Sequence, residues 1–139
     1  IEKEFDYIFC IASFHHIPTK EMRLRVLSEM RRVLKGGGKM FMTNWNLWRL
    51  INPFQKSVWR YICNHHTQKN WKHPQVKGIK DIMTHFGNVK APIYYHAFTI
   101  KELKRLVREA GFTVNESFYS KNEKQAHWWN GNNLVFVCS

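Results

Sequence analysis

Cysteine is scarce in this sequence, and no two cysteines form an obvious pair. The 139 residues contain only Cys10, Cys63 and Cys138, which are far apart and include no CxxC motif. An odd and scattered set excludes a disulfide framework and favours a reducing compartment. No apolar run reaches the roughly 18 residues that would cross a membrane. We therefore expect a cytoplasmic protein that has no membrane partner.

The sequence also lacks the usual spacing of zinc ligands. Cys63, His65, His66 and His73 lie close together, but two of the histidines are adjacent and no second Cys pair accompanies them. Structural zinc sites use four ligands at characteristic spacings, and this group matches none of them. We expect no metal site.

Acidic residues are almost missing from the middle third of the chain. Residues 47–96 contain eight Lys and Arg residues and a single acid, Asp81, so they contribute +7 of the formal net charge of +12. Such a field attracts polyanions, and aromatic side chains interleaved with basic ones are typical of RNA-binding surfaces. General solubility is the alternative explanation. We predict an RNA partner, with Lys69 and Lys72 among the residues that bind the substrate.

Apolar runs and helical spacing predict a strand–helix–strand unit in the first third of the chain. Residues 5–12 are almost all apolar and too few for a helix, so we expect a strand buried on both faces. Thr19 is a candidate N-cap of the following helix, and residues 36–38 (GGG) are expected to end it through left-handed backbone geometry. Residues 39–45 form the next predicted strand. Short connections of this kind predict two parallel neighbouring strands.

A second helix and a hairpin are predicted in the last third. Thr99 and Glu102 form a T-x-x-E capping box, and Gly111 follows the apolar helix face as a stop signal. Residues 113–120 and 133–138 are two predicted strands that flank a polar stretch. This arrangement favours an antiparallel hairpin.

The segment between these halves carries fewer structural signals. Residues 47–63 are predicted to be mainly helical, with a break near Pro53, and polar and basic residues dominate from 64 to 80. We interpret residues 47–95 as a basic, aromatic insertion over the sheet. The insertion belongs to a single partial domain that covers residues 1–139.

Two motifs resemble the class I S-adenosylmethionine-dependent methyltransferases. Residues 5–18 (FDYIFCIASFHHIP) are similar to the fourth-strand motif of that family. Residues 27–39 (LSEMRRVLKGGGK) resemble its next helix and turn, L-x-E-x-x-R-V-L-K-P-G-G, with Gly36 in place of the proline. The resemblance implies an α/β, Rossmann-like methyltransferase fold. This chain would supply the C-terminal half, with parallel strands and a terminal antiparallel hairpin.

A narrower resemblance comes from residues 94–99 (YYHAFT), which lead into Glu102 and Leu103. This stretch is similar to R-Y-Y-H-x-F…E-L of the tRNA wobble-uridine carboxymethyl methyltransferases and their bacterial relatives, with Ile93 in place of the arginine. Trp45 stands where that group has a tryptophan after the fifth strand. The resemblance implies methyl transfer to tRNA or another RNA. A small-molecule methyltransferase and a non-catalytic RNA-binding or partner subunit are the alternatives.

The resemblance also assigns site residues at the carboxyl ends of the predicted strands, where open parallel sheets bind ligands. The expected cofactor is S-adenosyl-L-methionine, held by Ile11, Ala12, Ser13, Phe14 and His15. The expected substrate-binding residues outside the lysines are Asn44, Trp45, Tyr94, Tyr95 and His96. A carboxylate acceptor needs no general base. For a ring nitrogen or hydroxyl acceptor, His16 or His96 is the expected catalytic base.

Two parts of the class I cofactor pocket are not found in the sequence. These enzymes bind the cofactor chiefly with a Gly-rich loop after the first strand and an acidic residue that ends the second. Residues 36–38 do not replace this loop, because they follow a helix and precede a strand. We therefore expect the N-terminal half of the domain to be missing and the chain to be inactive alone. The expected partners are tRNA, the missing half of the domain and a small partner protein.

Overall fold

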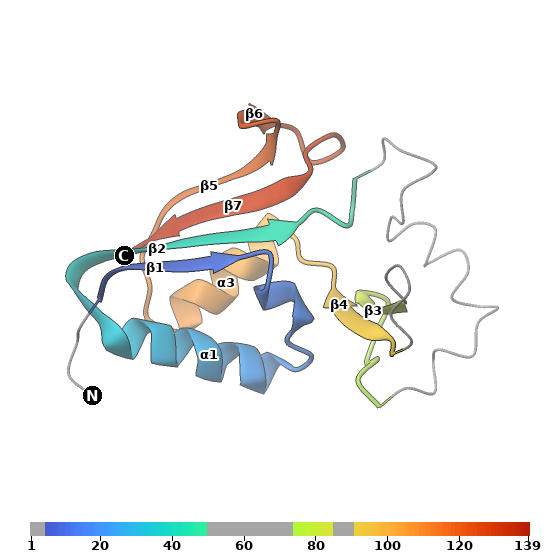
Figure 1. Ribbon diagram of the computed structural model, residues 1–139, viewed down its shortest axis with the longest axis horizontal. Coiled ribbons are helices and arrows are strands. Elements are labelled where there is room, and N and C mark those ends of the chain that lie inside the picture. The colour runs from blue at the N-terminus through green and yellow to red at the C-terminus, as the bar shows by residue number, and fades with distance from the viewer. Residues whose placement is uncertain (1–4, 50–73, 85–90) are drawn as a thin grey trace.

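The computed structural model describes residues 5–49, 74–84 and 91–139, and its elements are arranged around one larger sheet (Figure 1). In chain order these elements are β1 (Phe5–Ile11), η1 (Phe14–His16, a 3-10 turn), α1 (Lys20–Val33), β2 (Leu34–Trp45), β3 (Asp81–Thr84), β4 (Ile93–His96), α3 (Ile100–Glu109), β5 (Val114–Lys121), β6 (Lys124–Ala126) and β7 (Asn133–Cys138).

The larger sheet is mixed and has five strands in the order β1-β2-β7-β5-β6. β1 and β2 are parallel, and β7 pairs antiparallel with both β2 and β5. The parallel neighbours and the terminal hairpin are therefore confirmed. α1 and α3 lie on the same face of the sheet (Figure 1). The core between them contains fully buried apolar side chains such as Leu27, Met40, Leu103 and Phe136, each of which stabilises the fold by about 1.5–3 kcal/mol.

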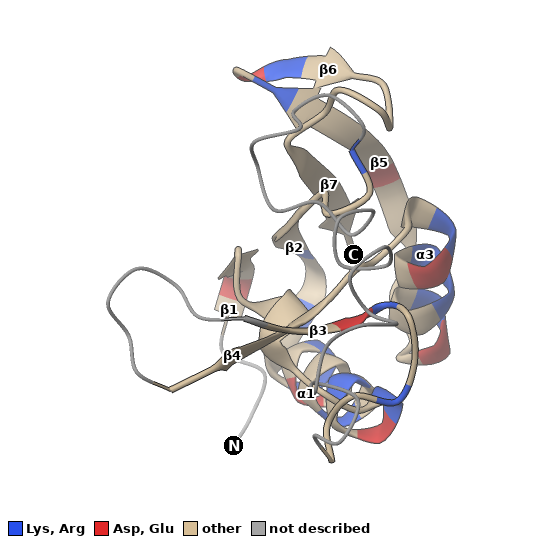
Figure 2. Ribbon diagram, turned by 90° about the vertical axis from the view of Figure 1, so that its right-hand side faces the viewer, with Lys and Arg blue, Asp and Glu red and all other residues tan. Residues whose placement is uncertain are grey.

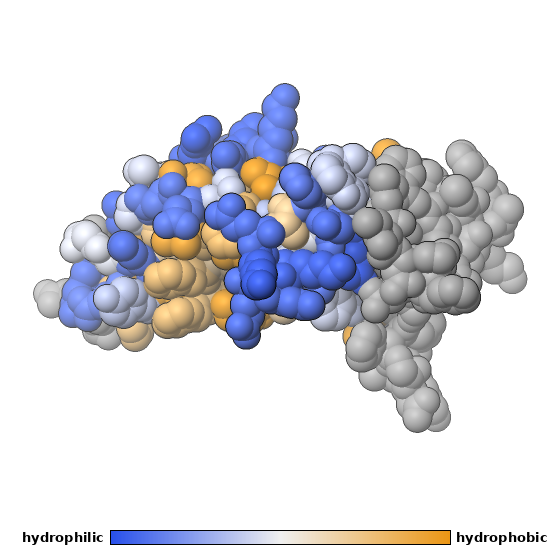
Figure 3. Space-filling view, turned by 90° about the horizontal axis from the view of Figure 1, so that it is seen from above, coloured by the Kyte–Doolittle hydropathy of each residue, from blue (hydrophilic) through white to orange (hydrophobic). Residues whose placement is uncertain are grey.

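Only one face of β1 is covered, so the expectation of a strand buried on both faces is wrong. Cys10 is buried, whereas Tyr7 is 61% and Phe9 67% exposed. The physical reason is that α1 and α3 both lie on the other face of the sheet, which leaves alternate residues of β1 open. Phe9 stacks instead on Phe41 of β2, with ring centroids 5.3 Å apart. Figure 3 looks onto the molecule from above and shows hydrophobic residues gathered there among hydrophilic ones.

α1 begins as predicted but ends before the three glycines. The Thr19 hydroxyl accepts a hydrogen bond from the Met22 N–H at 3.2 Å, which confirms the N-cap. Residues 36–38 belong to β2 rather than to a helix stop, which corrects the sequence prediction. The small size of Gly38 is needed because a Cβ there would lie 2.9 Å from the backbone oxygen of Asp6. Gly38 therefore allows β2 to approach β1 closely.

α3 follows the prediction at both ends, with one difference in its cap. The Thr99 hydroxyl accepts from the Glu102 N–H at 3.2 Å, and Gly111 adopts φ +88° after the helix. The Glu102 side chain, which was expected to complete the capping box, contacts His96 and Lys80 instead. Its carboxylate therefore joins α3 to the region of β3 and β4.

β3 and β4 form a separate two-stranded antiparallel sheet that the sequence did not predict. Each strand has only four residues, too few for a clear period-2 pattern. In Figure 1 this hairpin lies beyond the ends of β1 and β2, where the two arrows point. Residues 50–73 are outside the described part of the chain, and most of the helix predicted over 47–63 falls on them.

Candidate functional site

The carboxyl ends of β1 and β2 are tied together directly after β1. Ala12 has a left-handed backbone with φ +48°, and its N–H donates to the Thr43 carbonyl at 3.0 Å. The chain then turns through η1 toward β4. Ile11 and Ser13 are exposed at this edge. Because ligands of open α/β sheets bind beyond these strand ends, three of the predicted cofactor residues lie where a ligand is expected.

Phe14 and His15 differ from these residues because both are buried. Phe14 stacks on Phe98 with ring centroids 5.6 Å apart, so it belongs to the core. His15 Nδ1 lies 3.2 Å from Asn44 Oδ1 at the end of β2. Since an amide oxygen accepts, His15 donates from Nδ1 and keeps a lone pair on Nε2. His15 Nε2 and Asn44 Nδ2 are buried and bond to no described residue, so this pair presents one acceptor and one donor.

Four aromatic rings pack together beside this pair. Tyr95 stacks on His15 at 5.6 Å and on Trp45 at 5.6 Å, with interplanar angles of 15° and 18°. His16 lies 4.6 Å from Tyr95 and 4.4 Å from His15 between ring centroids. Tyr95 is buried, whereas Trp45 is 38% exposed. A ring supported on one face and open on the other is suited to stacking a flat ligand.

His16 is oriented by β4 and differs from His15 in its exposure. Its Nδ1 lies 2.9 Å from the Tyr94 carbonyl oxygen, to which it must donate. The neutral ring then carries its lone pair on Nε2. No described residue bonds to that nitrogen. His16 therefore keeps an acceptor that a base would need.

His96 is held between two carboxylates. Its Nδ1 lies 2.7 Å from Asp81 Oδ1 and its Nε2 lies 2.8 Å from Glu102 Oε1. Because a carboxylate only accepts hydrogen bonds, this geometry has the ring donating from both nitrogens. In this arrangement His96 has no lone pair with which to accept a proton. Its geometry is that of a positioning residue rather than of a catalytic base.

Further side chains extend this contact into a buried network. The Tyr94 hydroxyl donates to Asp81 Oδ1 at 2.5 Å and accepts from Arg23 Nη2 at 3.0 Å. Lys80 Nζ donates to Glu102 Oε2 at 2.7 Å. These bonds join the β3–β4 hairpin to α1 on one side and to α3 on the other. The network therefore fixes the strand that carries Tyr95.

The network also sets the charge of its members. Burial by itself raises the pKa of Asp81, but hydrogen bonds from His96 and Tyr94 outweigh it and hold the pKa at about 2. Burial also raises the pKa of Glu102, while hydrogen bonds from His96 and Lys80 lower it to about 2. The pKa of Tyr94 is raised, first by burial and then by its bond to Asp81. Both carboxylates are therefore charged, and the phenol is neutral, near pH 7.

The network contains Arg23, Asp81 and Glu102, which no sequence pattern assigned to the site. Arg23 lies among apolar positions of α1 and is only 4% exposed. Arginine is rarely buried to this degree, so the sequence gave no signal for it. Asp81 did leave a signal, since it is the only acid within residues 47–96. The predicted substrate residues Lys69 and Lys72 lie outside the described residues.

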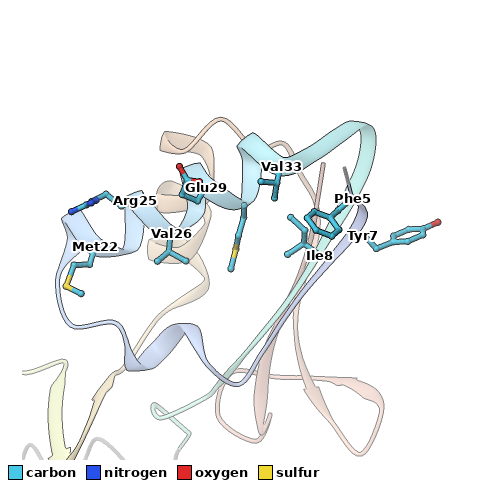
Figure 4. Close-up of a pocket in the computed structure, with 9 residues that line it drawn as sticks. Phe5, Tyr7, Ile8, Met22, Arg25, Val26, Glu29 and Val33 are labelled. Carbon is cyan, nitrogen blue, oxygen red and sulfur yellow. The ribbon is translucent and has the colours of Figure 1, made fainter. Parts of the chain in front are cut away.

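A groove of about 830 Å³ lies away from this site, between α1 and β1. Figure 4 shows Ile8 and Val26 pointing into it, whereas Tyr7 points away. Its lining is mostly apolar, with Arg25 and Glu29 as the charged members. We place the candidate site at the strand ends, because the orphaned buried polar atoms and three histidines gather there, whereas the groove has a mostly apolar lining.

Two features are absent from the described ranges. No three potential metal ligands come together in them. No helix in the same ranges is long and apolar enough to cross a membrane.

The buried His15 predicts a specific pH dependence of stability. Burial, followed by the charge of His16, lowers its pKa from 6.5 to about 4. As the pH falls through this window the unfolded chain takes up a proton that the folded chain does not, so stability is lost. We expect His15 alone to lower the free energy of unfolding by about 2 kcal/mol between pH 7 and pH 5. Urea unfolding of the wild type and His15→Gln at both pH values measures this, and an equal loss in both proteins contradicts it.

Several known proteins that resemble this chain are methyltransferases. Residues 1–42 match the family model described as a methyltransferase domain. The tRNA (carboxymethyluridine(34)-5-O)-methyltransferase of Schizosaccharomyces pombe is 28% identical over 133 residues, which cover 90% of this chain and 55% of that protein. The probable tRNA methyltransferase 9B of Mus musculus is 31% identical over 91 residues, covering 57% and 20%. The chain therefore spans from a fifth to about half of the length of these relatives.

The fold is shared with solved structures. A SAM-dependent methyltransferase from Methanosarcina mazei matches with a TM-score of 0.67 at 18% identity, covering 99% of this chain and 59% of that one. Sequence identity at this level supports the Rossmann-like fold and nothing finer.

Motif, fold and relatives agree on one class, and the chain resembles the class I S-adenosylmethionine-dependent methyltransferases. The expected cofactor, S-adenosyl-L-methionine, is confirmed as the cofactor of that class. Within the class the chain resembles the tRNA carboxymethyluridine methyltransferases, as residues 94–99 predicted.

Proposed function

We propose that the protein transfers a methyl group from S-adenosyl-L-methionine to a nucleotide of tRNA. The observation that carries this proposal is the ring cluster at the strand ends, where the exposed face of Trp45 is backed by the buried Tyr95. Such a platform is suited to a base that has been turned out of its stack. The names of the two tRNA methyltransferase relatives support the same substrate class.

The strand ends also fit the methionine part of the cofactor. Its ammonium group is a donor and its carboxylate an acceptor, which complements the free acceptor on His15 Nε2 and the free donor on Asn44 Nδ2. Ile11, Ala12 and Ser13 would line the same edge. When bound, the cofactor supplies a methyl group activated by a sulfonium. The contribution of the residues is to align the acceptor and exclude water.

The acceptor decides whether His16 takes part. A carboxylate acceptor, as in the named substrate of the yeast relative, is already ionised and needs no base. A ring nitrogen or hydroxyl acceptor carries a proton, which His16 Nε2 could accept because its Nδ1 is committed to Tyr94. In both cases Trp45 and Tyr95 orient the nucleotide.

The test uses the natural full-length protein and tritiated S-adenosyl-L-methionine. Label should enter bulk tRNA, and digestion should place it in a modified uridine. Release of the label as methanol by mild alkali would identify a carboxylate ester, whereas stable label would indicate a nitrogen or ether acceptor, for which His16 is the candidate base.

Two other results would overturn the proposed substrate. Label in small metabolites with none in RNA would show a small-molecule methyltransferase. RNA binding with no cofactor uptake, measured by calorimetry, would show a non-catalytic RNA-binding subunit. The expected small partner protein is tested by adding it to the methyl-transfer assay and measuring whether more label enters tRNA.

A further inference from the structure

Four cations form a stripe along one side of α3. They are Lys101, Lys104, Arg105 and Arg108, here called the α3 stripe. Their spacing of i, i+3, i+4 and i+7 places them on neighbouring positions of the helix surface. Three of them are exposed and Lys104 is half-buried. No hydrogen bond or ion pair joins the side chain of any of the four to another described residue.

The acids of α3 do not neutralise this stripe. Glu102 is held by His96 and Lys80, and Glu109 bonds to Lys20 of α1 at 2.9 Å. Cations of α1 differ, because most of them have partners: Arg32 bonds to Glu29 at 2.7 Å, and Arg23 and Arg31 donate to oxygen atoms. Unpaired positive charge therefore gathers on α3, whose Lys and Arg segments are blue in Figure 2.

Helix electrostatics explain only one of these cations. Arg108 lies in the last turn of α3, where the helix dipole favours a cation, whereas Lys101 lies in the first turn, where the dipole disfavours one. Like charges three and four residues apart also repel one another. The repulsion within the stripe and the position of Lys101 therefore oppose the stability of the helix. Such an arrangement is expected where an external anion supplies the missing partner.

The shape of the surface suits an extended polyanion. The stripe lines a groove together with Lys80 and Thr99. From Lys101 to Arg108 it extends about 10 Å, at 1.5 Å per residue, which corresponds to about three phosphates of one duplex strand. Lys101, the first residue of the stripe, lies two residues after the Thr99 cap. The next residue, Glu102, bonds to His96 of β4. The stripe therefore leads away from the edge of the candidate site.

We propose that the α3 stripe binds the phosphate backbone of the RNA whose nucleotide reaches the ring cluster. The inference rests on the proposed function, since it names the surface that the RNA substrate uses. It adds a second basic surface to the one that the sequence indicated within residues 47–96. Phosphate contacts of this kind position a nucleic acid and do not read its sequence.

The experiment compares two quadruple variants of the full-length protein that remove the same charge. One neutralises the stripe (K101Q, K104Q, R105Q, R108Q). The other neutralises exposed cations elsewhere that also have no described partner (R25Q, K39Q, K121Q, K124Q). Binding of a fluorescent tRNA transcript is measured by anisotropy from 50 to 300 mM salt. Calorimetry measures cofactor affinity, and thermal unfolding confirms that both variants fold.

The stripe variant should lose about tenfold or more in RNA affinity, and the slope of log K against log salt should fall by about 2 to 3. Cofactor affinity should not change, and the control variant should lose less than about twofold. Equal losses in both variants, or an unchanged slope in the stripe variant, would overturn the inference. Methyl transfer by the wild type separates the two proposals. If the wild type methylates tRNA but the stripe variant binds tRNA normally, only the proposed role of the α3 stripe is wrong. If the wild type binds tRNA through the stripe but methylates none, only the proposed function is wrong.

Discussion

Replacing Glu102 by Gln should lower the free energy of unfolding by about 2–3 kcal/mol, because it removes a charge from a buried network. Glu102 is the only described link between His96 and α3, and its side chain is 14% exposed. The neutral amide cannot accept from both His96 and Lys80 with charge assistance. β4 should loosen, and methyl transfer should fall with it, since Tyr94 and Tyr95 orient His16 and the ring cluster. Urea unfolding and the tRNA assay measure the two effects.

Glu109→Gln is the matched control for this change. It is the same substitution on the same helix and also removes an ion pair to another element, but the bond to Lys20 is exposed, with side-chain exposures of 50% and 41%. An exposed pair of this kind contributes less than about 1 kcal/mol. If both variants lose the same stability, the network has no special role.

The depressed pKa values predict where the contribution of Glu102 disappears. The folded pKa of about 2 lies below the ordinary value of 4.5, so the stabilisation is present above pH 4.5 and is lost as the pH falls toward 2. Glu102→Gln should therefore differ most from the wild type near neutral pH and should converge with it near pH 2. A difference that persists unchanged at low pH would point to lost packing rather than lost charge.

Replacing Trp45 by Ala should lower kcat/KM for tRNA by about 10- to 100-fold, because base stacking on an aromatic side chain contributes about 1–3 kcal/mol. Tyr95 supports one face of the indole and leaves the other to the nucleotide. Trp45→Phe should recover part of the activity, since it keeps a flat ring. Cofactor affinity should stay near the wild-type value, which separates a substrate contact from a general disturbance of the site.

Trp129→Ala is the control for exposure. Trp129 is also 38% exposed and stacks on His127 at 4.3 Å, but it lies in the loop between β6 and β7. Its removal should change kcat/KM by less than about twofold. Equal losses at the two tryptophans would show that exposed aromatic area, rather than the position at the end of β2, governs binding.

Features that depend on a few neighbouring residues could be predicted from the sequence. The hydroxyl of Thr99 caps α3 and Gly111 follows its end, because both effects act within one helical turn. The parallel pairing of β1 with β2 also followed from a short connection through one helix. The class of fold was predicted in another way, from the resemblance of residues 5–18 and 27–39 to methyltransferase motifs.

Burial and partnership were decided only by the tertiary structure. The sequence of β1 is almost entirely apolar, yet Phe9 is exposed because the helices cover the opposite face. His96 was a reasonable candidate base until the fold brought Asp81 and Glu102, from β3 and α3, to its two nitrogens. Capping and strand pairing are local and leave a pattern in the sequence. Which carboxylate meets which imidazole depends on how distant elements pack, and no local pattern records it.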